Sequence, residues 1–426
     1  MASCKSLFLI FLTTLICICD STTTEKKPPA RSQSFRLALG SLSKSSVSKY
    51  AATSSSSSHK YKSSVHVSMA PIVSLPIGTP PQLVPVVLDT GSQLPWAHCA
   101  PKKSPSSGYS SAFIPSLSTS YRPVLCHNNS DCPTSNPDLV PPTCTKLRCT
   151  YSIFYADSMS ISGSLFHETF TFNSDSPVIL GCSPVNDSSG AQGILGMNLG
   201  NFSLVSQLGI SKFSYCISSN NLGFFYIGDN TNDNNNNPNH VTKRIDFTWF
   251  PDEAELRPSL DKDAYTVHLV AIRINGTKLN VSESAFWPDA NGSGQTIIDS
   301  ATEPTYLVDQ AYAEVKTRVE SLTGARFNMT SSQSFEMCFR GNNVTAAAQA
   351  IGDLGLEFDG GVEMVIPMER AMVNVGDGVS CVGILNSGLM NRPGSILGYV
   401  MFKDVRMEYD VVNKKIGFGE FGGCGS

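Results

Sequence analysis

The sequence predicts a mostly β protein made of two related lobes, with a central cleft and few short helices. Short apolar segments bounded by glycine, proline and asparagine recur along the chain, which is typical of strands joined by turns. An apolar run ending in an aspartate occurs twice, at 86–92 (VVLDTGS) and 297–302 (IIDSAT). Ile-Leu-Gly follows the first aspartate by 105 residues, at 194–196, and the second by 97 residues, at 396–398. This repeat favours two tandem lobes related by a pseudo-two-fold axis.

Length and composition fit that architecture. The chain has 426 residues, of which 41% are hydrophobic and 15% charged, enough for two globular domains with sizeable cores. The expected lobes are 69–240, with a polar asparagine-rich loop near its end, and 241–426.

The N-terminus is typical of a secreted protein. Residues 7–19 (LFLIFLTTLICIC) form an apolar run behind Lys5, which fits a signal peptide over 1–19 better than a membrane span. No other run approaches the length of a membrane helix, and the tail after Phe421 lacks the hydrophobic segment of a lipid-anchor signal. We therefore expect the secretory pathway, with an extracellular, cell-wall or vacuolar destination and no membrane anchor.

Charge is distributed unevenly between the leader and the body. Residues 20–68 carry a net charge of +6; since the whole chain carries −4 and the signal adds +1 from Lys5, residues 69–426 carry −11. A basic leader on an acidic body suggests a pro-segment held by electrostatics and released when carboxylates protonate at low pH. A disordered serine-rich linker explains the same composition equally well. Nothing is basic enough to indicate a nucleic-acid partner, and a monomer is expected.

Cysteine usage agrees with secretion. Removing the signal peptide leaves an even number of cysteines, so five disulfides are expected. These ten are Cys99, Cys126, Cys132, Cys144, Cys149, Cys182, Cys216, Cys338, Cys381 and Cys424. Zinc binding by the cluster at 126–149 is the alternative, which the lack of CxxC pairs disfavours.

Glycan acceptors are also present if the chain enters the secretory pathway. The Asn-X-Ser/Thr sites are Asn128, Asn186, Asn201, Asn275, Asn280, Asn291, Asn328 and Asn343.

In the first half, 73–81 and 83–88 predict two strands about a Gly-Pro turn, and the second strand delivers Asp89. Residues 100–150 form a Ser/Pro-rich insertion that four cysteines would cross-link. The remaining expected elements are an aromatic hairpin from 151–155 and 165–172, strands at 178–182, 193–196, 212–217 and 223–227, and a short helix within 198–209.

In the second half, 264–274 alternates apolar and polar residues and predicts a clear strand leading to the second motif. Residues 309–322 begin with an acid and have helical periodicity. Further strands are expected at 363–366, 380–385, 395–398, 405–411 and 415–419.

The repeated motif points to acid–base chemistry. Across a pseudo-two-fold axis, Asp89 and Asp299 would face each other, share one proton and titrate as a pair. The charged member can activate a water while the protonated member donates to an amide carbonyl, which hydrolyses a peptide bond without a covalent intermediate or a cofactor.

The residues beside each aspartate suit this role. The hydroxyls of Thr90 and Ser300 can bond across to hold the two loops, and those of Ser92 and Thr302 can bond the outer carboxylate oxygens. A glycine such as Gly91 lets a backbone N–H approach.

A lid over the cleft is also predicted. The aromatic hairpin carries Tyr155, whose hydroxyl could accept from the indole N–H of Trp96 and so hold the hairpin over the cleft. Asp157 lies two residues further on and is expected at the same flap.

From residue 71 to 424 the chain resembles a pepsin-like aspartic peptidase of the plant nepenthesin-like branch, closest to the atypical nodulin and cell-survival type. The resemblance is carried by LPIGTPPQ (75–82), VLDTGSQLPW (87–96), YSIFYADSMSISG (151–163), GILGMN (193–198), KFSYC (212–216), AYTVHLVAIRING (264–276), GQTIIDS (294–300) and SILG (395–398).

The resemblance implies a bilobal fold, a zymogen leader and an acid-optimum endopeptidase that binds an extended protein or peptide substrate under a flap. It makes Asp89 and Asp299 the catalytic pair and Tyr155 the flap tyrosine. It also suggests the disulfides Cys182–Cys216 and Cys338–Cys381. Further expected pairs are Cys126–Cys149, Cys132–Cys144 and Cys99–Cys424.

The chain departs from the family at Ala301, where relatives have glycine, and at flap positions 156 and 158, where glycine is common. If position 301 needs a positive φ, alanine costs about 1 kcal/mol. Its methyl group could also displace the pair, and a shift of about 1 Å can cost about a hundredfold in rate. Two hypotheses follow: a working endopeptidase, which we favour, and a weak or inactive relative that binds peptides or proteins in the same cleft.

Overall fold

The structure is a computed structural model that describes residues 61–68, 70–101, 111–133, 139–155, 159–184, 191–228, 241–250, 257–390, 393–419 and 424. They belong to the unit 42–426. The expected signal peptide at 1–19 and the leader up to residue 60 lie outside the described residues.

Strands dominate both halves of this unit, as predicted. In the first half they are β1 (Tyr61–Val67), β2 (Pro71–Ile77), β3 (Gln82–Asp89), β4 (Trp96–Cys99), β5 (Arg122–Pro123), β6 (Leu139–Thr145), β7 (Arg148–Phe154), β8 (Ser160–Phe170), β9 (Asn173–Pro184), β10 (Gly193–Gly196), β11 (Lys212–Ile217) and β12 (Leu222–Ile227). In the second half they are β13 (Val241–Thr248), β14 (Thr266–Val267), β15 (Leu269–Ile274), β16 (Thr277–Lys278), β17 (Thr296–Asp299), β18 (Thr305–Leu307), β19 (Thr330–Ser332), β20 (Phe335–Arg340), β21 (Asp353–Phe358), β22 (Val362–Pro367), β23 (Met372–Gly376), β24 (Val379–Val382), β25 (Ile384–Asn386), β26 (Ser395–Gly398), β27 (Arg406–Asp410) and β28 (Lys415–Gly419).

The internal repeat has the same strand arrangement in each half. β10 runs parallel to β3 and antiparallel to β4, and β26 runs parallel to β17 and antiparallel to β18. Each Ile-Leu-Gly segment therefore lies between the strand that ends in the aspartate and the strand that follows it. The fold is bilobal and mostly β, as expected.

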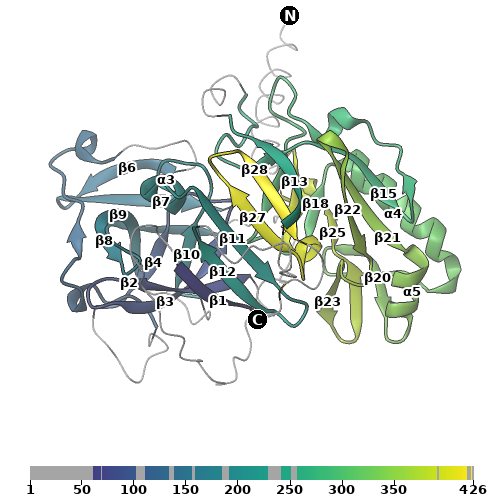
Figure 1. Cartoon of the computed structure of the whole chain (residues 1–426), viewed down its shortest axis with the longest axis horizontal. Helices are drawn as coiled ribbons and strands as arrows, with labels where there is room; N and C mark the ends of the chain where they lie inside the picture. The colour runs from purple at the N-terminus through teal and green to yellow at the C-terminus, as the bar shows by residue number, and fades with distance from the viewer. Residues whose placement is uncertain are drawn as a thin grey trace, which may run out of the picture. The chain divides into compact units, whose positions relative to one another are not determined.

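A shared sheet joins the two lobes. β27 pairs with β11 from the first half and with β28, which in turn pairs with β13. Figure 1 shows β27 and β28 in yellow between the purple-to-teal strands of the first lobe and the green strands of the second. The last two strands of the chain thus belong to the sheet that connects the two lobes.

The first described strand is built into this sheet. β1 pairs antiparallel with β12 along Tyr61–His66 and with β2 along Val65–Val67. Its alternate residues Tyr61, Ser63 and Val65 are buried. The expected boundary of the pro-segment, at residue 68, therefore falls after a strand that the body contains.

Helices are few. α3 (Leu204–Leu208) begins after the N-cap Ser203, whose side chain accepts from the Ser206 N–H, and ends at Gly209 with φ 58°. α4 (Asp309–Thr323) agrees with the predicted helix. α5 (Asn343–Ile351) was not predicted from the sequence. Its buried residues are Ala347, Ala348 and Ile351, and two of these three are small.

The structure corrects most of the expected disulfide pairs. Five disulfides form, and the pair Cys338–Cys381 agrees with the resemblance, but the other expected pairs are wrong. The bonds found are Cys99–Cys182, Cys126–Cys144, Cys132–Cys149, Cys216–Cys424 and Cys338–Cys381. Because the whole cluster at 126–149 is in disulfides, its sulfurs are not thiolate ligands for zinc.

Strand neighbours explain these corrections. Cys99 and Cys182 lie on β4 and β9, which run side by side, whereas Cys216 lies on β11 beside β27 and so near the chain end. Cys144 and Cys149 face each other across the β6–β7 hairpin, so each takes a different partner from the loop folded beside it, and the bonds cross instead of nesting.

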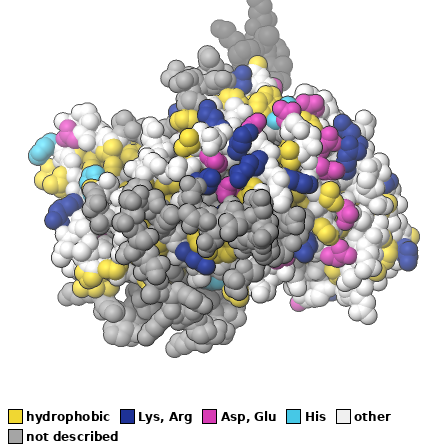
Figure 2. All heavy atoms as spheres, viewed as in Figure 1, with side chains coloured by type: hydrophobic (Ala, Val, Ile, Leu, Met, Phe, Trp, Pro, Cys, Tyr) yellow, Lys and Arg dark blue, Asp and Glu magenta, His cyan; other side chains and the backbone are white. Residues whose placement is uncertain are grey.

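None of the helices in the described part of the chain is long and apolar enough to cross a membrane. On the face shown in Figure 2, basic and acidic side chains lie close together on the part of the surface that carries β13 and β22. The ion pair Arg273–Glu357 connects the neighbouring strands β15 and β21, and Arg244–Glu408 connects β13 to β27 across β28.

Candidate active site

The two aspartates end equivalent strands. Asp89 is the last residue of β3 and pairs with Gly196, and Asp299 is the last residue of β17 and pairs with Gly398. The glycines are required because a loop crosses over each of them. A Cβ at Gly196 would lie 2.3 Å from the Gln93 carbonyl oxygen, and one at Gly398 would lie 2.3 Å from the carbonyl oxygen of Pro304.

Two buried hydroxyls lock the aspartate loops together across the lobes. The Thr90 N–H donates to Ser300 Oγ over 3.0 Å, and the Ser300 N–H donates to Thr90 Oγ1 over 3.0 Å. Each hydroxyl also donates to a carbonyl of the opposite strand, Thr90 to Ile298 and Ser300 to Leu88. Both side chains are fully buried, so these four bonds fix the relative position of the two loops.

Each carboxyl group receives the same pair of donors. At Asp89 the N–H of Gly91 donates to Oδ1 over 2.8 Å and the Ser92 hydroxyl to Oδ2 over 2.5 Å. At Asp299 the donors are the N–H of Ala301, over 2.9 Å, and the hydroxyl of Thr302, over 2.5 Å. Each carboxyl is therefore held by its own loop, and the two carboxyls are close enough to hydrogen-bond each other.

Their environment makes the pair hold a proton. Burial and then the neighbouring charge of Asp299, which also hydrogen-bonds Asp89, raise the pKa of Asp89 to about 7, against the lowering effect of Ser92 and Gly91. Below that pH the Asp89 carboxyl keeps its proton, which lets it act as the acid in general acid–base hydrolysis.

The hairpin predicted as a lid is bonded to Trp96 through one side chain. β7 and β8 pair antiparallel, and the hydroxyl of Tyr155 at the end of β7 accepts from Trp96 Nε1 over 2.7 Å. Trp96 is buried, so the tyrosine hydroxyl is bonded to a fixed partner. Asp157 and the flap positions 156 and 158 lie outside the described residues.

Two tyrosines beneath the pair were not identified from the sequence. Tyr215 on β11 and Tyr409 on β27 are fully buried with ring centroids 6.1 Å apart, and burial together with nearby Asp299 raises the pKa of both. In the sequence they lie in alternating strands, where an aromatic residue indicates only core. Their position below the pair depends on the shared sheet that joins β11 to β27.

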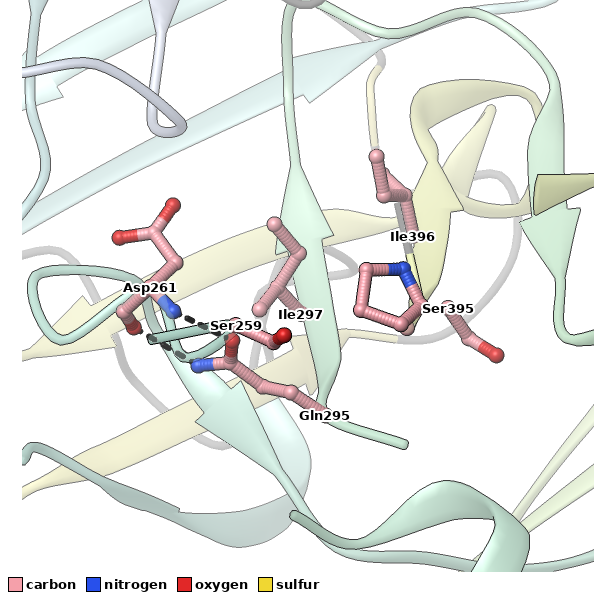
Figure 3. A pocket seen from close by; sticks show the side chains of 8 residues that line it. Ser259, Asp261, Gln295, Ile297, Ser395 and Ile396 are labelled. Carbon is pink, nitrogen blue, oxygen red and sulfur yellow. Dashed lines mark hydrogen bonds between the residues drawn. The ribbon is translucent and has the colours of Figure 1, made fainter. Parts of the chain in front are cut away.

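A small pocket opens elsewhere. It is lined by Ser259, Asp261, Gln295, Ile297, Pro393, Gly394, Ser395 and Ile396. Figure 3 shows the Gln295 side chain bonded to the backbone of Asp261: its amide donates to the Asp261 backbone carbonyl and accepts from the Asp261 N–H. Neither Asp89 nor Asp299 is among the residues that line this pocket.

Two facing carboxyls, locked loops and a tyrosine-tipped hairpin define the site architecture of an aspartic peptidase. The comparisons with known proteins agree with this class. Family models described as "Xylanase inhibitor N-terminal" and "Xylanase inhibitor C-terminal" match residues 72–229 and 264–420. The chain belongs to the family of pepsin-like plant aspartic proteases.

Among its relatives, the aspartic proteinase PCS1 of Arabidopsis thaliana is 30% identical over 380 residues, which cover 83% of this chain and 82% of the relative. Aspartic proteinase nepenthesin-1 of Nepenthes gracilis is 30% identical over 356 residues, covering 82% and 76%. Among solved structures, basic 7S globulin from soybean matches with a TM-score of 0.60 at 20% identity, over 84% of this chain and 94% of that one. Conglutin gamma from lupine seeds matches with a TM-score of 0.61 at 19% identity, over 85% and 95%. These two structures show the fold alone.

Proposed function

We propose that this protein is a secreted endopeptidase that hydrolyses peptide bonds of proteins at acid pH, with Asp89 and Asp299 as its catalytic residues. The mirrored hydrogen bonds at the two carboxyls support this most strongly. A chain that kept the fold without the chemistry would not need both carboxyls, both loop-locking hydroxyls and both outer-oxygen donors.

The geometry supports a concerted mechanism. One carboxylate takes a proton from a water as its oxygen attacks the amide carbonyl carbon, while the protonated carboxyl donates to the carbonyl oxygen. The resulting diol collapses when the amide nitrogen is protonated and the C–N bond breaks. Tyr155, held by Trp96, would cover an extended substrate and exclude water.

The direct test is cleavage of a denatured protein substrate at about pH 3 to 5, with and without a statine-type transition-state inhibitor. We expect cleavage that the inhibitor blocks. A folded sample without its leader that cleaves nothing between pH 3 and 7 would contradict the proposal.

The leader fits this role as a signal peptide at 1–19 followed by a pro-segment. Since β1 belongs to the sheet, we propose that the pro-segment ends before Tyr61 rather than at residue 68. The lobes would then span about 61–240 and 241–426, secreted to the cell wall or the vacuole as a monomer. Seven of the eight glycan acceptors are described and all seven are exposed, which suits glycosylation.

The alternative is a weak or inactive protein that binds peptides or proteins in the same cleft. This alternative is motivated only by alanine at position 301 in place of glycine. The backbone of Ala301 does not have a positive φ, so alanine causes no backbone strain there. The Ala301 N–H also keeps its bond to Asp299. The peptidase therefore remains the better supported function.

A further inference from the structure

The two halves of the site differ in where their methyl groups lie. The donors to Asp89 and Asp299 match within 0.1 Å. The first loop carries Thr90 and Ser92, and the second carries Ser300 and Thr302, so each loop has one threonine and one serine in opposite order. The remaining difference is Gly91 in one half and Ala301 in the other.

The glycine position faces the carboxyl group of the opposite half. A Cβ at Gly91 would lie 3.0 Å from Cγ of Asp299 and 3.1 Å from both of its carboxyl oxygens. The pseudo-two-fold axis relates Gly91 to Ala301 and Asp299 to Asp89. By this symmetry the methyl group of Ala301 would point at the Asp89 carboxyl, whereas Gly91 presents no methyl group to Asp299.

We propose that the methyl group of Ala301 makes the paired carboxyls unequal, so that Asp89 holds their single proton and Asp299 is the base that activates water. Ala301 is on this view a positioning residue for the proton, and the inference rests on the proposed peptidase function. The methyl group removes water from one face of Asp89, and a neutral carboxyl loses less by that desolvation than a charged one.

Burial and electrostatics agree with this assignment. Asp89 is 5% exposed and Asp299 9%. Burial is the largest cause of the raised pKa of Asp89, ahead of the charge of Asp299. Tyr215 on β11 and Tyr409 on β27 face Asp299, and their raised pKa values keep them neutral.

The proton balance then assigns each transfer. Asp299 takes a proton from water as the C–O bond forms, and Asp89 gives its proton to the carbonyl oxygen. In the second step protonated Asp299 gives its proton to the amide nitrogen, the C–N bond breaks, and a diol hydroxyl returns a proton to Asp89. The pair regains its starting state.

The test compares wild type with Ala301→Gly in the secreted, glycosylated protein. The pH profile of kcat/KM should keep its shape, but in the variant its alkaline limb should lie about half a pH unit lower. At pH values on the alkaline side of both limbs, kcat/KM of the variant should therefore be about threefold lower than that of wild type. The control Ala325→Gly removes an exposed methyl group far along the chain from the motif and should leave the limb in place.

Melting temperature against pH gives a readout that needs no activity. A group whose folded-state pKa is raised loses its stabilising effect as pH rises from about 4 to about 7. Ala301→Gly should therefore lose less stability than wild type across this window. If neither the alkaline limb nor the melting profile moves, the inference is wrong; if wild type cleaves nothing, the peptidase proposal fails and the melting comparison still decides the role of Ala301.

Discussion

Replacing Thr90 with valine tests whether the buried hydroxyls hold the two lobes in register. Valine keeps the shape but removes the hydroxyl that accepts from the Ser300 N–H and donates to the Ile298 carbonyl. Because Thr90 is fully buried, both backbone groups would lose their partner. At about 1–3 kcal/mol for each unpaired group, the free energy of unfolding should fall by about 2–6 kcal/mol.

Chemical denaturation followed by intrinsic fluorescence measures this loss. The matched control is Thr145→Val on the exposed edge of β6, where the hydroxyl makes one 3.4 Å contact with the Thr150 hydroxyl. We expect the control to change the free energy of unfolding by less than about 0.5 kcal/mol. A Thr90→Val protein as stable as the control would refute the account of the locked loops.

Three further predictions concern the flap, the chain end and the leader. Tyr155→Phe removes the acceptor of the Trp96 N–H, and loss of one such bond should lower kcat/KM about three- to tenfold; equal kinetics would contradict the flap role. Replacing Cys216 and Cys424 together by serine should lower the free energy of unfolding by about 2–5 kcal/mol in denaturation experiments, whereas an unchanged value would show that this bond does not stabilise the fold. N-terminal sequencing of the mature protein should find a start at or before Tyr61, and a start at residue 69 would show that β1 is removed.

The sequence predicts the architecture well because a repeat is visible without knowing any contact. The two aspartate motifs and their Ile-Leu-Gly partners have the same order and spacing, and the structure pairs them in the same register, with Asp89 opposite Gly196 and Asp299 opposite Gly398. A strand that ends in a carboxylate and a turn has a local signature, so the positions of both aspartates follow from it.

Features that depend on distant neighbours were harder to predict. Cys216 finds Cys424 only because β11 pairs with β27, 208 residues separate the two cysteines, and no local pattern records that contact. The same sheet brings Tyr409 near Asp299, although its sequence indicates an ordinary core position. β1 was predicted as leader because its serines and lysine look like a linker, but pairing with β12 and β2 orders it.

The central claim is that Asp89 and Asp299 act as one unit. Its most direct measurement is the rate of inhibitor-sensitive cleavage at acid pH by Asp89→Asn and Asp299→Asn, each purified as a folded protein and compared with wild type. We predict that either change alone lowers kcat by about a thousandfold or more, since each removes the proton sharing that the other carboxyl needs. Cleavage at the wild-type rate by either variant would contradict the account.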